Sequence, residues 1–138
     1  MTADPIAEDP RVGDVHPDGL TGQFLEAADQ GVFLIKRGPS GRALEPMRQT
    51  CPDTGSTDLG WEPAGGGARL VSWTVAGSGQ AAAVLAIGEL DEGPWWWARI
   101  VDADPAALAA GQRLRIVFRR AAEGAQAIPV YALDTHGG

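Results

Sequence analysis

The sequence predicts a mainly β protein of 138 residues, built around a five-stranded barrel that follows a short N-terminal extension. Five strand-like runs follow one another after residue 61, and a short helical turn separates the third run from the fourth. The chain is 44% hydrophobic and 21% charged, which is ordinary for a globular domain and excludes wholesale disorder. A chain of this length can bury roughly two-thirds of its unfolded surface, so a core without disulfides is feasible.

The N-terminal part predicts a tail and then a helix. Residues 1–17 hold three prolines and several acids without an apolar period, which predicts a flexible acidic tail. Residues 18–31 predict a short helix, because Leu20, Phe24 and Ala27 recur at helical spacing and a glycine closes the segment.

The next segment predicts one strand and then irregular structure. Residues 32–35 are apolar and β-branched or aromatic, which favours a strand. Residues 37–56 are rich in Gly, Pro, Ser and Thr, which is typical of loops and tight hairpins.

The barrel strands are predicted from alternating or largely apolar runs. The clearest is the fourth, in which Leu114, Ile116 and Phe118 point to one side and three arginines to the other, namely Arg113, Arg115 and Arg119. A helical turn is expected over residues 104–111, since Asp104 suits the N-cap position and is followed by a proline. The five predicted strands span residues 68–76, 82–90, 95–102, 112–120 and 127–133. Five strands with a helix between the third and fourth are the pattern of the OB-fold, a small Greek-key barrel.

Charge and composition narrow the class of partner and the compartment. Eleven basic residues against 18 acidic ones give a net charge of −7, which disfavours binding to nucleic acid. No apolar run is long enough to span a membrane, and no secretory signal is visible at the N-terminus. With a single cysteine, these features favour a cytoplasmic protein without disulfides.

The candidate catalytic motifs are weak, and we expect no catalytic residue in this chain. The stretch Gly77-Ser-Gly79-Gln-Ala-Ala82 fits a dinucleotide-binding fingerprint, but a strand follows it where a helix is needed, so a hairpin loop is favoured. Cys51 is the only thiol, and a thiol nucleophile needs a base. The only histidines, His16 and His136, lie in the predicted tails.

Three consecutive tryptophans allow several interpretations. On a strand, Trp95 and Trp97 share one face and Trp96 takes the other. One interpretation puts two of them in the core and one against the N-terminal extension. A second makes an outward tryptophan, here Trp96, an anchor for a partner protein. A third is stacking on adenine or another planar ligand.

A row of arginines is the candidate cofactor site. Arg113, Arg115 and Arg119 alternate along the fourth strand, and Arg99 lies on the third. A solvated strand face is the simpler interpretation. If functional, the row would suit phosphates such as those of coenzyme A, or an acidic patch on a partner. Our candidate cofactor-binding residues are Arg99, Arg113 and Arg115.

Several stretches resemble a known family. The most specific are Glu89-Leu-Asp-Glu-Gly-Pro94 and the aspartate–proline turn ending at Pro105. Others are Phe24-Leu-Glu26, Phe33-Leu-Ile-Lys-Arg37, Cys51-Pro-Asp-Thr-Gly-Ser56, Leu59-Gly-Trp61, 68–75 and 111–118. Across residues 18–133 the chain resembles the OB-fold acyl-CoA-associated family that carries an N-terminal rubredoxin-like zinc ribbon.

The resemblance implies a ribbon that has lost its metal. The family's four ligand positions are occupied by Gly38, Gly41, Cys51 and Thr54. One thiolate cannot hold a structural zinc, which takes four Cys or His ligands, so we expect no zinc. The expected organisation is a tail over 1–17, a helix with a degenerate ribbon-like lobe over 18–60, the OB-fold over 61–133 and a tail over 134–138.

The resemblance also implies a function. Family members are accessory subunits of acyl-CoA enzymes, bound to thiolase-fold partners (thiolases, acyltransferases, aldolases) or to MaoC-like hydratases. We therefore expect a scaffolding subunit that is not an enzyme alone, with a thiolase-fold partner supplying the catalysis and a MaoC-like hydratase as the alternative partner. A coenzyme A thioester shared with the partner is the only cofactor implied. The expected partner-contacting residues are Leu20, Phe24, Phe33, Trp61 and Trp96. A free-standing OB-fold binding module remains a further alternative.

Overall fold

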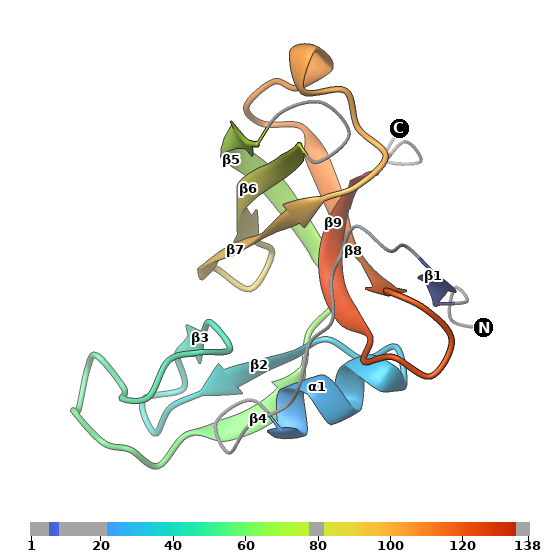
Figure 1. Ribbon diagram of the computed structural model, residues 1–138. Coiled ribbons are helices and arrows are strands. Elements are labelled where there is room, and N and C mark those ends of the chain that lie inside the picture. The colour runs from blue at the N-terminus through green and yellow to red at the C-terminus, as the bar shows by residue number, and fades with distance from the viewer. Residues whose placement is uncertain (1–5, 9–21, 78–81, 135–138) are drawn as a thin grey trace.

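The computed structural model describes residues 6–8, 22–77 and 82–134. These residues form two sheets, one α-helix and one short 3-10 helix (Figure 1). In chain order the elements are β1 (Ala7–Glu8), α1 (Gly22–Asp29), β2 (Leu34–Arg37), β3 (Ala43–Leu44), β4 (Gly60–Pro63), β5 (Gly67–Ala76), β6 (Ala83–Leu90), β7 (Trp95–Ile100), η3 (Pro105–Ala107), β8 (Arg113–Arg120) and β9 (Ile128–Leu133).

The larger sheet closes on itself as a barrel. Its strand order is β1-β8-β5-β6-β7-β9, and an additional pairing of β8 with β9 completes the ring. The pairing of β7 with β9 is parallel, at Ile100 and Tyr131, whereas β5, β6 and β8 pair antiparallel with their barrel neighbours. This order, with η3 between the third and fourth barrel strands, confirms the predicted mainly β, five-stranded OB-fold.

The turn before β8 forms as the sequence predicts. Asp104 caps η3, with its carboxylate accepting a hydrogen bond from the Ala106 N–H at 3.0 Å. Pro105 occupies the first turn, where its missing N–H costs nothing. The turn is therefore capped locally, and the end of the predicted segment is bound to β5, where the Gly111 N–H donates to the Leu70 carbonyl at 2.8 Å.

The smaller sheet forms an N-terminal lobe, which we define as α1 with strands β2, β3 and β4. β2 lies in the middle and pairs antiparallel with both neighbours. β2 begins two residues later than predicted, and the part of the predicted helix before Gly22 lies outside the described residues. Trp61 lies on β4, opposite Lys36 of β2, so it belongs to the small sheet rather than to a barrel strand.

Lobe and barrel share one hydrophobic core. Phe24 and Leu25 of α1 belong to the same buried cluster as the barrel residues Leu70, Leu114 and Tyr131. Figure 1 shows α1 and the small sheet lying against one end of the barrel. Tyr131 has no exposed surface, and its hydroxyl donates a hydrogen bond to the Trp96 carbonyl at 2.9 Å. Burial raises the pKa of Tyr131, so this hydroxyl stays a donor at physiological pH.

Polar contacts fix the helix to the loop that joins β8 and β9. The Asp29 carboxylate accepts a hydrogen bond from the Ala127 N–H at 2.8 Å, and the Gln126 side-chain amide donates to the Leu25 carbonyl at 2.8 Å. Both contacts run between α1 and that loop, and the first satisfies a backbone N–H of the loop. They hold the lobe in one position on the barrel.

We expect Gly88→Ala to destabilise the barrel by about 1–3 kcal/mol, the usual cost of overpacking. A Cβ at Gly88 would lie 2.6 Å from the Tyr131 hydroxyl and 2.7 Å from its ring carbon, inside van der Waals contact. Gly60→Ala is the control, because no atom lies within 4 Å of a Cβ built there. Urea unfolding measures both; equal stability of the two variants would contradict this packing.

Candidate functional site

Four of the five predicted partner-contacting residues meet where the lobe joins the barrel. Phe33 lies 4.9 Å from Trp96 between ring centroids, and Phe24 lies 6.2 Å from both Trp61 and Trp96. Tyr131 completes this aromatic cluster, 5.7 Å from Trp96. The fifth predicted residue, Leu20, lies outside the described residues.

The aromatic cluster is mostly interior, which corrects its expected place on the surface. Phe24 and Phe33 are only 5% and 4% exposed, and Trp96 and Trp61 pack partly buried against the core. The physical reason is that α1 lies over this end of the barrel, so the rings contact each other instead of solvent. These side chains join lobe to barrel and leave little surface for a partner.

The three tryptophans alternate between the two faces of β7 as predicted. The face that carries two of them is the outer one, contrary to the interpretation that puts two in the core. Trp95 and Trp97 are 57% and 61% exposed, whereas Trp96 points inward. Trp96 lies opposite Gly88 of β6 and packs against the ring of Tyr131, which fills the space beside that glycine. One tryptophan is therefore inside and two are outside, and the arrangement with two in the core is wrong.

The outward tryptophans share a face with apolar residues of β6. In the strand register, Ile87 lies opposite Trp97 and Leu85 opposite Arg99, so these side chains are on the same side of the sheet. We call the outward side chains of Leu85, Ile87, Trp95 and Trp97 the tryptophan face. None of these four belongs to a core cluster of the described residues.

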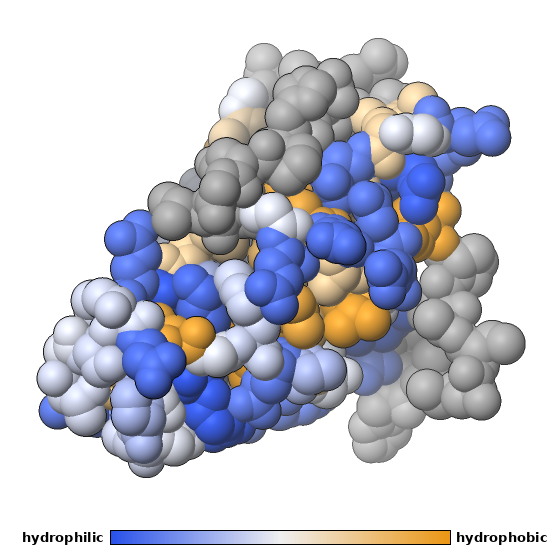
Figure 2. All heavy atoms as spheres, turned by 90° about the horizontal axis from the view of Figure 1, so that it is seen from below, coloured by the Kyte–Doolittle hydropathy of each residue, from blue (hydrophilic) through white to orange (hydrophobic). Residues whose placement is uncertain are grey.

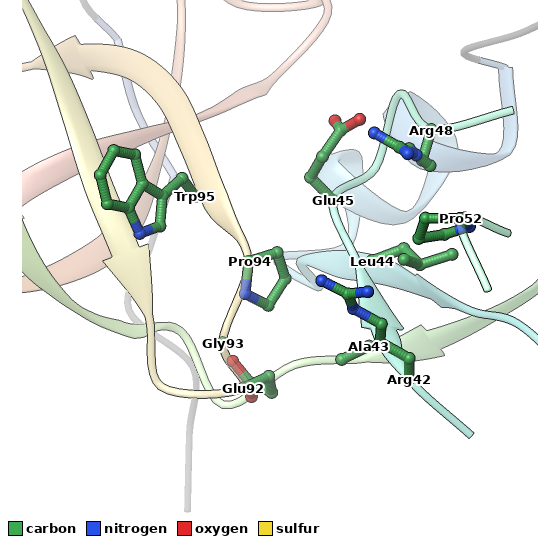
Figure 3. A pocket seen from close by; sticks show the side chains of 10 residues that line it. All are labelled: Arg42, Ala43, Leu44, Glu45, Arg48, Pro52, Glu92, Gly93, Pro94 and Trp95. Atoms are coloured by element: carbon green, nitrogen blue, oxygen red, sulfur yellow. The ribbon is translucent and has the colours of Figure 1, made fainter. Parts of the chain in front are cut away.

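A pocket of about 420 Å³ separates the lobe from this edge of the barrel (Figure 3). Trp95 and Pro94 line its barrel side, and Arg42, Leu44 and Pro52 are among the residues on its lobe side. The Arg42 guanidinium contacts the Asp53 carboxylate at 3.3 Å. Because Glu45 and Glu92 line the pocket together with Arg42 and Arg48, its charge is mixed and selects neither anion nor cation.

The structure places the three candidate cofactor-binding arginines in different surroundings. Arg113 makes two hydrogen bonds to the Asp91 carboxylate, at 2.9 and 3.0 Å, and these lower the pKa of Asp91. Arg113 also lines a surface pocket, Arg99 lines a separate pocket beside Asp102, and Arg115 lines neither of these two pockets. A shared role of the three in holding phosphates stays a prediction.

The four predicted ligand positions lie in two turns. The Gly41 N–H donates to the Gly38 carbonyl at 2.9 Å, and the Gly55 N–H donates to the Cys51 carbonyl at 2.7 Å. The turns touch, because a Cβ at Gly38 would lie only 2.8 Å from the Cys51 sulfur. The ribbon-like origin of the lobe stays a prediction.

The surroundings of Cys51 are hydroxyl-rich rather than ligand-rich. The thiol is buried. Hydrogen bonds lower the pKa of Cys51 to about 7, with the largest contribution from Thr54 and the next from Ser40. The Ser40 oxygen lies 3.6 Å from the sulfur. Among the described residues, no group of three or more Cys, His, Asp or Glu is placed to hold a metal ion.

The described residues offer no assembled nucleophile, base and orienting group. Both histidines lie outside them.

The lower face of the molecule presents mostly hydrophilic side chains with smaller hydrophobic areas between them (Figure 2). Within residues 6–8, 22–77 and 82–134, no helix is long and apolar enough to cross a membrane.

Comparison with known proteins agrees with the barrel topology. The family described as "ChsH2, C-terminal OB-fold domain" matches residues 61–119. The chain is also similar to a chain of the solved structure titled "Ltp2-ChsH2(DUF35) aldolase", with 23% identity and a TM-score of 0.74. That match covers 86% of this chain and 98% of the other. No curated protein matches.

The barrel is thus an OB-fold domain by topology and by family comparison. The residues similar to the ChsH2-type OB-fold family, 61–119, span β5, β6, β7 and nearly all of β8. This confirms the OB-fold resemblance that the motifs of the barrel region indicated, including the stretch from Glu89 to Pro94.

We expect Trp96→Ala to lower the free energy of unfolding by about 3 kcal/mol, because it empties a site that four rings share. Trp97→Ala is the matched control, since the neighbouring indole is mostly exposed and its loss should change stability by less than about 0.5 kcal/mol. Chemical unfolding measures both. Equal stabilities would show that Trp96 does not join the lobe to the barrel.

Metal analysis of the purified chain should find well under one zinc per molecule. Cys51 contributes a single thiolate, and its neighbours Thr54 and Ser40 offer hydroxyls in place of the Cys or His ligands that structural zinc takes. Stoichiometric zinc that survives dialysis against a chelator would contradict this expectation.

Proposed function

We propose that this chain is a non-catalytic accessory subunit of an acyl-CoA-using enzyme complex of the thiolase superfamily. It stabilises a catalytic subunit that supplies the nucleophile and base. The observation that carries the proposal is the extent of the structural likeness. A TM-score of 0.74 over 86% of this chain includes more than the OB-fold barrel, and the similar structure's title pairs ChsH2 with Ltp2 in an aldolase.

The chemistry of the described residues supports the same conclusion. Cys51 is buried and surrounded by hydroxyls, and no described residue is placed as its base. The barrel interior is filled by Leu70, Leu114, Tyr131 and their neighbours, so it has no room for a substrate. A protein of this kind acts through its surface, and the packed junction of lobe and barrel suits a scaffold.

Affinity capture of the tagged full-length chain from its native lysate tests the proposal. We expect a thiolase-superfamily protein, identified by mass spectrometry, to be retained in near-stoichiometric amount and to co-elute with the chain on gel filtration. An unrelated acidic protein with the same tag is the control.

The other outcomes of this capture overturn the proposal. Retention of a MaoC-like hydratase in its place would favour the alternative partner. If the intact, folded chain retains neither protein, the chain would share the fold of ChsH2 but would not act as a subunit of such a complex.

A further inference from the structure

Two large apolar side chains stand on the outside of the barrel. Trp95 and Trp97 lie two residues apart on β7, both more than half exposed, beside Ile87 and Leu85 of β6. No ring contact to either indole is found among the described residues, whereas Trp96 between them has three. A contiguous apolar surface of this kind marks an interaction site more often than chance exposure.

The position of this surface in the fold is informative. β6 and β7 are the second and third strands of the barrel, and their face is the one on which OB-folds bind oligonucleotides and oligosaccharides. Trp95 also lines the pocket between lobe and barrel, so the tryptophan face continues into a recess (Figure 3). An occupant could therefore cover the indoles and place a side chain in the pocket.

The charges of this face favour a protein over a nucleic acid. Glu89 lies opposite Trp95 on the neighbouring strand, and it is paired with Arg69 of β5. The negative charge of Glu89 beside Trp95 is therefore neutralised by a neighbouring positive charge. A nucleic-acid strand needs several unpaired cations to replace its counterions, and a chain of net charge −7 opposes it further.

The area is sufficient for the centre of a protein interface. Taking about 250 Å² for a free indole side chain, the two tryptophans expose together about 300 Å². A standard interface buries about 800 Å² on each partner, so they would supply over a third of this side. Tryptophan is also the residue type most enriched among interface residues that dominate binding energy.

We infer that the tryptophan face of β6 and β7 is the surface on which the catalytic thiolase-superfamily subunit docks. This inference rests on the proposed function and adds the location of the interface. The partner presents an apolar patch with hydrogen-bond acceptors at its rim for the two indole N–H groups. One of its side chains enters the pocket beside Trp95.

The test uses the full-length chain and the thiolase-superfamily protein that the wild-type chain retains from lysate. Trp95→Ala and Trp97→Ala should each weaken binding of that purified protein at least about 30-fold, as expected for residues at the centre of an interface. Met47→Ala is the matched control, because Met47 is a large apolar residue, 41% exposed, on the lobe. It should leave the dissociation constant unchanged.

A second measurement keeps the inference testable even if the tryptophan-to-alanine variants do not fold. Benzoylphenylalanine replaces Trp97 in one sample and Met47 in another, and ultraviolet light cross-links whatever lies against each position in the assembled complex. We expect the catalytic subunit to be cross-linked from position 97 and not from position 47.

The outcomes separate this inference from the proposed function. If the wild-type chain retains the catalytic subunit but both tryptophan variants bind it as tightly, or position 97 gives no cross-link, the interface lies elsewhere and the accessory role stands. If no thiolase-superfamily protein is retained by the wild type, both ideas fail. Binding of single-stranded oligonucleotides at low salt that the tryptophan variants lose would overturn the docking surface in favour of nucleic acid.

Discussion

The packing of Phe24 and Phe33 against Trp96 is the contact on which the rest of the structure depends. It joins α1 and the small sheet to the barrel through two almost fully buried phenylalanine rings and the partly buried Trp96. Tyr131 supports Trp96 from the barrel side, both by ring contact and by its hydrogen bond to the Trp96 carbonyl. Because Trp96 is turned inward by this packing, strand alternation turns Trp95 and Trp97 outward. One interior contact therefore sets both the position of the lobe and the composition of the outer face.

In this arrangement the interior is packed, and the features that can recognise another molecule lie on the surface. The described core residues of the barrel pack into one hydrophobic cluster, and Cys51 sits in a buried turn of the lobe. Arg113, which could have bound phosphate, is engaged by Asp91 on two hydrogen bonds. What the surface offers is a pair of indoles beside a recess of mixed charge, which is more typical of protein recognition than of catalysis.

Most of the barrel could be predicted from the sequence because its strands alternate clearly. On β8, Leu114 and Phe118 lie on one side and the arginines on the other. A shift of one residue in register would therefore turn the apolar side chains out of the core. The orientation of the tryptophans could not be predicted, because alternation fixes which residues share a face but not which face is inside. That choice depends on Phe24 of α1 and on Tyr131 of β9, which contact the Trp96 ring but lie far from it in the sequence. Trp61 was equally ambiguous, since its pairing with Lys36 of β2 is a long-range contact that no local pattern signals.

The most direct test of the account is the division of chemistry between the two subunits. Acyl-CoA thioester turnover should be measured with this chain alone, with the thiolase-superfamily subunit alone, and with the two mixed in equal amounts. The account predicts no turnover by this chain alone and the highest rate in the mixture, because the chain supports a catalytic centre that it does not contain. Turnover by the isolated chain, particularly if it survives Cys51→Ala, would contradict the account.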